Sequence, residues 1–314
     1  MRFLTSLRDI ELGVGLTRPY DVALFASGYE SRASALPRRF SRERIFRPVI
    51  LGFRENSDNP VRQLNDRYFK EAWQADPVNL SSGEPGAVAK ILEQNVNSSS
   101  EEARVLIDIS SMSRGWYADA INWARFSQGP QRIVLDFIYQ SGIYPGAYPH
   151  RTVSETTTLS GFEGQSDVRL QTVALLGLGY DPITPHAILE DLQPDLKYAF
   201  VAGGSSASAL ALALDLNRAT IEELDGNVVV IPLMSIQDSY RALAEMSLPH
   251  SGIRNVVIVT LGPKTHTLAS LLLASHHEEI TCLHVKGSSS ELMDVLPADG
   301  VSLCSVVFDQ KSQP

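Results

Sequence analysis

The stretch that decides the fold is Val22-Ala23-Leu24-Phe25-Ala26-Ser27-Gly28-Tyr29-Glu30, an apolar run that ends in glycine, tyrosine and a carboxylate. About half the chain further on it returns as Val173-Ala174-Leu175-Leu176-Gly177-Leu178-Gly179-Tyr180-Asp181. Nearly the same shift lays the apolar run 104–108 on 256–260. Internal repeats indicate architecture directly, because each copy is one folding unit. The sequence therefore predicts two similar lobes with a groove between them, where equivalent loops face one another about a pseudo-two-fold axis.

Short apolar runs alternate with longer amphipathic segments in both halves, which is typical of a parallel sheet flanked by helices. The expected strands are 21–26, 47–53, 77–80, 104–109 and 132–139, then 173–178, 198–202, 227–233, 255–260, 280–285 and 301–308. The expected helices are 32–40, 60–74, 85–95 and 115–126, then 185–192, 207–216, 237–246 and 265–276. The predicted fold class is α/β, with two tandem doubly wound, Rossmann-like parallel sheets related by internal duplication.

The predicted domain boundaries follow from a change in composition between the halves. Residues 1–145 form the first lobe and residues 168–314 the second. Residues 146–167 are rich in glycine, proline, serine and threonine, which favours a connector or hairpin.

Composition predicts a globular cytoplasmic protein without a membrane segment. The 314 residues are 44% hydrophobic and 20% charged, which suits two domains. The apolar stretches stop short of the roughly 18 residues that a spanning helix needs. The first residues lack the apolar core of a secretion signal. The two cysteines, Cys282 and Cys304, lie in apolar runs, which favours buried thiols over disulfides or a metal site.

Charge disfavours general binding to nucleic acid, because the chain carries a net charge of −9 and such binding needs an excess of lysine and arginine. One basic cluster stands out, formed by Arg38, Arg39, Arg42, Arg44 and Arg47. Serine and glutamate interrupt it, so we interpret it as a solvated helix face and connecting loop, with a local anion pocket as the alternative.

Candidate ligand contacts follow three strands of the first lobe. In an open parallel sheet, ligands bind beyond the carboxyl ends of the strands, where helix amino ends offer unpaired N–H groups. The loops expected there are 27–32, 54–56 and 108–114, and each carries an arginine. Serine hydroxyls can bond phosphate or ribose oxygens, and arginine binds phosphate with a forked pair of bonds. The predicted contacts are Ser27, Tyr29, Arg32, Arg54, Ser110, Ser111, Ser113 and Arg114.

The segment Asp108-x-Ser110-x-x-x-Arg114 resembles the signature of CRISPR-associated Rossmann-fold (CARF) domains, which is Asp or Asn, any residue, Ser or Thr, three more, then Arg or Lys. The resemblance implies a nucleotide-sensing Rossmann-like module, because paired lobes in such families bind cyclic oligonucleotides. SAVED domains are similar fusions of two CARF-like units in one chain. The resemblance covers the order of elements over most of the chain, and one short motif carries it.

The second lobe departs from this pattern. Thr260 stands in the place of Asp108, and Leu261-Gly262-Pro263-Lys264-Thr265-His266 replaces the serine-rich loop. Lys264 and His266 are candidate anion contacts, while the alternative is a simple turn with Thr265 capping the next helix. Gly204 and Ser205 belong to a loop that looks superficially like the phosphate loop of GHMP kinases. The other motifs of those kinases are missing, so close helix packing or phosphate contact is favoured there.

Signals of catalysis are sparse. Glu30 and Asp108 are the candidate general bases, with a salt bridge to Arg32 or Arg114 as the alternative role of Glu30. The seven histidines show no metal-ligand spacing beside a carboxylate, and no nucleophile elbow is present. The sequence thus predicts neither a metal site nor a bound cofactor.

Three functions remain open at this stage. The first is a sensor of a nucleotide messenger, such as a cyclic oligonucleotide, that signals to a partner protein in a prokaryotic defence-type system. The second is an enzyme that cleaves a nucleotide or phosphosugar, with arginines holding the phosphate. The third is an inert adaptor that kept the fold and lost the pocket.

Overall fold

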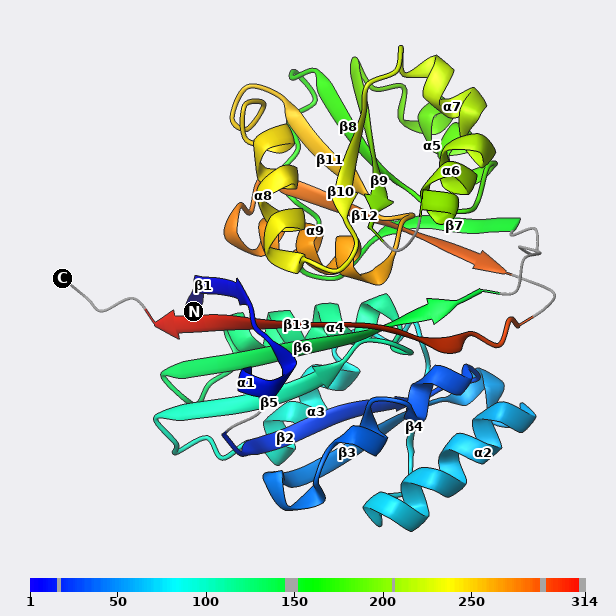
Figure 1. Cartoon of the computed structure of the whole chain (residues 1–314). Helices are drawn as coiled ribbons and strands as arrows, with labels where there is room; N and C mark the ends of the chain where they lie inside the picture. Colours follow the sequence, from blue (N-terminus) through cyan, green and yellow to red (C-terminus); the bar gives the residue numbers. More distant parts are fainter. Residues whose placement is uncertain (16–17, 145–151, 205–206, 289–291, 311–314) are drawn as a thin grey trace. The chain divides into compact units, whose positions relative to one another are not determined.

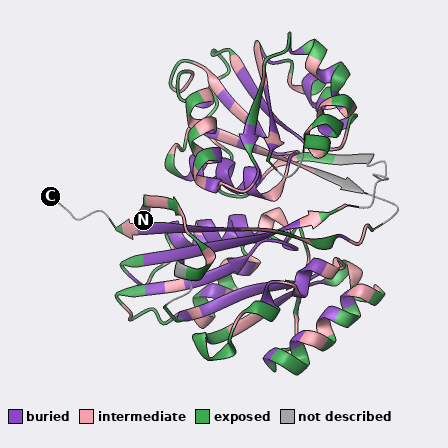
Figure 2. Cartoon of the chain, viewed as in Figure 1, coloured by how far each residue is buried: buried purple, intermediate pink, exposed green. Residues whose placement is uncertain are grey.

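The computed structural model of the chain describes residues 1–15, 18–144, 152–204, 207–288 and 292–310 (Figure 1). It divides into two compact units, of which unit 1 comprises Met1–Gly146 and Leu292–Pro314 and unit 2 comprises Ala147–Glu291. Each unit is a mixed α/β structure built on one sheet in which parallel strands predominate. The sheet strands supply much of each buried core (Figure 2).

The seven-stranded sheet of unit 1 has the order β1-β13-β6-β5-β2-β3-β4. Its strands are β1 (Arg2–Asp9), β2 (Tyr20–Ser27), β3 (Ile45–Phe53), β4 (Val78–Leu80), β5 (Glu102–Asp108), β6 (Arg132–Ile143) and β13 (Leu296–Gln310). Strands β2 to β6 are parallel, while β13 is antiparallel to both β6 and β1. The chain order of the parallel strands reverses between β2 and β5. That reversal is the switch point at which doubly wound sheets bind ligands.

The helical segments of unit 1 lie between its strands in the sequence. They are α1 (Leu12–Gly15), η1 (Ser31–Ser34), η2 (Pro37–Arg39), η3 (Arg42–Arg44), η4 (Arg54–Asn56), α2 (Pro60–Tyr68), the π-helical turn η5 (Phe69–Trp73), α3 (Ala87–Asn95) and α4 (Arg114–Phe126). The predicted helix 32–40 is wrong, because η1 and η2 are separate 3₁₀ turns. Pro37 begins η2 and has no backbone N–H with which to continue a helix from η1.

The six-stranded sheet of unit 2 has the order β10-β9-β8-β11-β12-β7. Its strands are β7 (Thr152–Thr158), β8 (Thr172–Leu178), β9 (Leu196–Gly203), β10 (Val228–Pro232), β11 (Asn255–Val259) and β12 (Ile280–Ser288). Its helices are α5 (Thr184–Leu192), α6 (Ala207–Leu216), α7 (Arg218–Glu223), α8 (Ile236–Ser247) and α9 (Lys264–His276). Strands β8 to β12 are parallel, and β7 is antiparallel to β12.

The repeated sequence occupies the same place in both sheets. Strand β2 lies between β3 and β5, and β8 lies between β9 and β11, so the parallel strands of both sheets have the same order. Gly28 follows β2 as Gly179 follows β8, while Asp108 ends β5 and Thr260 follows β11. The shared order agrees with two Rossmann-like halves, and their origin by duplication stays a prediction.

The chain is divided differently from the predicted domains. The expected second lobe ran to residue 314, but β13 pairs antiparallel with β6 and β1 and so completes unit 1. In turn β7, from the expected connector 146–167, pairs with β12 in unit 2. The reason is that each parallel sheet ends in an open strand edge, and a strand distant in sequence can close it.

Two further predictions, on the cysteines and on membrane-spanning helices, can be compared with the structure. Cys282 and Cys304 are buried free thiols, as predicted. Within the described part of the chain, every helix is too short or too polar to cross a membrane.

Candidate functional site

The candidate site is the carboxyl edge of β2 and β5 in unit 1. Two loops meet there, the first after β2 at residues 28–30 and the second after β5 at residues 109–113. A Cβ atom at Gly28 would collide with the hydroxyl of Ser111. Glycine at this position therefore lets the two loops approach each other.

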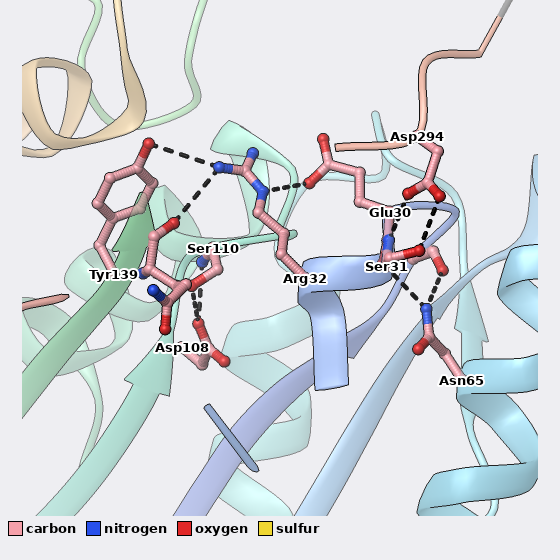
Figure 3. A network of polar contacts seen from close by, with 10 residues as sticks. Glu30, Ser31, Arg32, Asn65, Asp108, Ser110, Tyr139 and Asp294 are labelled. Atoms are coloured by element: carbon pink, nitrogen blue, oxygen red, sulfur yellow. Dashed lines mark hydrogen bonds and ion pairs between the residues drawn. The ribbon is translucent and has the colours of Figure 1, made fainter. Parts of the chain in front are cut away.

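Hydrogen bonds of Asp108 and Ser110 stabilise the second loop (Figure 3). The Oδ1 atom of Asp108 accepts hydrogen bonds from the Ser110 amide at 3.0 Å and from its hydroxyl at 2.5 Å. The same hydroxyl accepts a bond from the Gln140 amide at 2.8 Å, which ties the loop to β6. Both side chains are buried. The Asp-x-Ser part of the motif thus shapes the loop and directs these polar groups into the fold.

Arg32 lies in the interior rather than at a rim. Its Nε donates to Glu30 at 2.7 Å, and its Nη1 lies 3.4 Å from the carbonyl of Gln140 and 3.5 Å from the hydroxyl of Tyr139 (Figure 3). Only 2% of the Arg32 side chain is exposed. Burial by itself lowers the pKa of Arg32, but the charge and hydrogen bond of Glu30, together with Tyr144 and Tyr139, raise that pKa above its usual value. Glu30 is therefore the counter-ion of a buried cation.

The first loop is held from both sides. The amide and hydroxyl of Ser31 donate to the Asp294 carboxylate at 2.6 and 2.7 Å, just before β13 (Figure 3). The side-chain amide of Asn65, on α2, donates to the carbonyls of Gly28 at 2.9 Å and Glu30 at 3.0 Å. The loop is thus fixed by α2 and by the segment that leads into β13.

Sequence reasoning missed the polar side chains of α2. Arg62 is buried and donates to Asp66 at 2.7 Å and to the carbonyl of Phe53 at 2.7 Å. Asp66 accepts a bond from the hydroxyl of Ser27 at 2.5 Å. Arg62, Asn65 and Asp66 are spaced by three and four residues, so they share one face of the helix. That spacing was the signal in the sequence that could have revealed a shared polar face. In the structure this face contacts Ser27 and Phe53, at the ends of β2 and β3.

Four predicted contacts remain at the rim of the site. Tyr29, Ser113 and Arg114 are half-buried, and Arg54 is exposed. Ser113 is the N-cap residue of α4, its hydroxyl donates to the carbonyl of Ser82 at 2.9 Å, and Arg114 begins the helix. The amino end of a helix favours an anion through its free N–H groups and dipole.

An aromatic row adjoins this rim. The ring of Tyr29 lies 6.1 Å from that of Phe53, which stacks on Trp116 with centroids 4.4 Å apart. Phe53 and Trp116 are buried. Tyr29, which is half-buried, therefore ends this aromatic row.

The predicted contacts of unit 2 do not form a matching rim. Thr260 is buried, and its hydroxyl donates to the carbonyl of Leu283 at 3.0 Å. His266 is buried with Nε2 3.1 Å from the carbonyl of Pro232, and burial lowers its pKa to about 4, so the ring is neutral at pH 7. Lys264 is half-buried at the start of α9. Gly204 follows β9 with φ of +96°, and Ser205 lies outside the described residues.

A cavity of about 540 Å³ lies at the opposite end of the unit 1 sheet, near the starts of β5 and β6. Two of its lining arginines are already paired, Arg104 with the buried Asp136 at 2.6 Å and Arg132 with Glu102 at 3.0 Å. The cavity is thus separate from the predicted contacts. Among the described residues, no group of three histidine, cysteine or acidic side chains is placed to hold a metal ion.

Comparison with models of known protein families gives no match, and comparison with curated protein sequences gives none either. The function of unit 1 is therefore inferred from its geometry and from the motif that ends in Arg114.

Proposed function

We propose that unit 1 binds an anionic, nucleotide-type ligand over the carboxyl ends of β2 and β5. One observation carries this proposal, namely that the strand order reverses between these strands where α4 begins with Ser113 and Arg114. Open α/β sheets bind their ligands in this place.

Each rim residue has a role that its chemistry suits. Arg114 and the first amides of α4 receive a phosphate, because a guanidinium forks onto phosphate oxygens and the helix end attracts negative charge. Tyr29 offers its ring to a base, since aromatic rings stack on any nucleobase. Arg54, which lies 3.7 Å from Glu84 at the surface, can turn toward a second phosphate.

Binding is favoured over turnover. Asp108 accepts a hydrogen bond from Ser110, whose hydroxyl in turn accepts one from the backbone amide of Gln140, while Glu30 balances the buried Arg32. A general base must reach the proton that it removes, and these groups are committed to the fold. With the CARF-like motif, this favours a sensor of a cyclic oligonucleotide that signals to a partner protein in a defence-type system.

The test is a thermal-shift screen of cyclic oligoadenylates, NAD and mononucleotides, followed by chromatography of the incubated compounds. A ligand at a hundredfold excess over its Kd stabilises the protein by about 2.7 kcal/mol, and the shift should shrink in Arg114→Ala but not in Arg241→Ala, an exposed control on α8. Absence of any shift would count against binding. Multiple turnovers would favour the enzyme instead.

A further inference from the structure

A second surface of unit 1, here called the arginine turn, comprises residues 38–47. It contains η3, part of η2 and the start of β3. Its five arginines are all exposed, as is Phe46, whose exposure is 74%. The helix that was predicted to carry these arginines is absent from the structure. The arginines lie instead on the 3₁₀ turns η2 and η3 and on the start of β3.

Intramolecular contacts leave much of this charge available. The Arg38 guanidinium lies 4.1 Å from the centre of the Tyr68 ring, and Arg47 donates to the carbonyl of Asn95 at 2.9 Å. The side chains of Arg39 and Arg42 make no hydrogen bond or ion pair with the described residues. Five arginines and one glutamate give the arginine turn a charge of +4, whereas the whole chain carries −9.

We propose that the arginine turn binds single-stranded nucleic acid. Phosphates suit it because arginine binds them with forked hydrogen bonds that lysine cannot make. Phe46 suits unpaired bases, because exposed aromatic rings stack on them and duplex bases are not open to such contact. The positive charge is local, so the binding is confined to this surface of an otherwise acidic chain.

This surface is separate from the proposed nucleotide site. The arginine turn lies at the start of β3, and Phe53 at the end of that strand adjoins the site. Eight residue steps of about 3.3 Å place the two ends of β3 about 26 Å apart. The two activities can therefore fail independently.

Fluorescence anisotropy with a labelled twelve-residue oligouridine tests the proposal. The full chain is compared with Arg39→Gln/Arg42→Gln, with Phe46→Ala and with the control Arg169→Gln, an exposed arginine of unit 2. Loss of two phosphate contacts should make the dependence of log Kd on log salt shallower by about 1.4. Loss of base stacking should weaken binding about fivefold to hundredfold without changing that slope.

Circular dichroism melting curves that match the wild type would show that each variant folds. The proposal is overturned if the full chain does not bind the oligouridine, if the variants bind as the wild type does, or if a duplex of the same length binds equally well. Tighter binding to an acidic peptide or to vesicles of phosphatidylserine and phosphatidylcholine would also overturn it.

Discussion

The side-chain amide of Asn65 donates a hydrogen bond of 2.9 Å to the carbonyl of Gly28, the residue that follows β2, the first parallel strand of unit 1. Asn217 donates one of 2.8 Å to the carbonyl of Gly179 in unit 2. Each asparagine follows the second parallel strand of its unit, and each is buried. The two bonds thus fix equivalent loops in the same way, although the surrounding sequences differ.

Asn65→Ala should lower the free energy of unfolding by about 1 to 3 kcal/mol, because the buried carbonyl of Gly28 loses the donor from Asn65 and the carbonyl of Glu30 is left with the Ala33 amide. Asn217→Ala should act similarly through Gly179. Urea unfolding of both variants measures the effect. If either substitution leaves stability unchanged, that asparagine does not clamp its loop.

Gly28→Ala should destabilise unit 1 by about 1 to 3 kcal/mol, because the added methyl group meets the hydroxyl of Ser111. The same substitution in a Ser111→Ala background should cost less than half as much. Gly115→Ala is the control, since a Cβ atom there would lie 3.4 Å from the carbonyl oxygen of Ser82, which is an ordinary contact. Equal costs of Gly28→Ala in both backgrounds would contradict the close approach of the two loops.

Glu30→Gln should lower stability by about 3 kcal/mol, because it leaves the buried Arg32 without its counter-ion. Glu84→Gln, in an exposed pair with Arg54, should cost less than about 1 kcal/mol. Chemical denaturation compares the two. A stable Glu30→Gln protein would reopen a catalytic role for this carboxylate.

Stability should depend on His266 between pH 6.5 and pH 4. Burial lowers the pKa of folded His266 to about 4, whereas its ordinary value is 6.5. In that window the unfolded chain takes up a proton that the folded chain does not. The free energy of unfolding therefore falls as the pH falls, by about 1.4 kcal/mol per pH unit. His266→Gln should remove this contribution, and identical pH slopes for the two proteins would refute the assignment.

The parallel strands were predictable, because their side chains carry the signal locally. The runs around 22–26 and 104–108 are apolar and short, and they became β2 and β5. Strand β1 (Arg2–Asp9) was missed, since its polar residues hide the pattern and its partner β13 lies at the other end of the chain. Pairing between such distant segments depends on which sheet edge is open, which no local pattern reports.

The candidate site was predictable in position but not in the orientation of its side chains. The loops at 27–32 and 108–114 do meet at the strand ends. Arg32 and Ser110 look like ligand contacts in the sequence, yet both are buried and bonded within the fold. A polar side chain can serve either a loop or a ligand, and only the packing around it decides which.

Isothermal titration calorimetry with the compound that gives the largest thermal shift tests the central claim, that unit 1 binds a nucleotide-type ligand at the edge of β2 and β5. Wild-type protein and the Arg241→Ala control should bind this compound with the same affinity. Arg114→Ala should bind about tenfold to hundredfold more weakly, since a bond to a charged group contributes about 1.5 to 3 kcal/mol. Unchanged affinity in Arg114→Ala, with its fold intact, would contradict the claim.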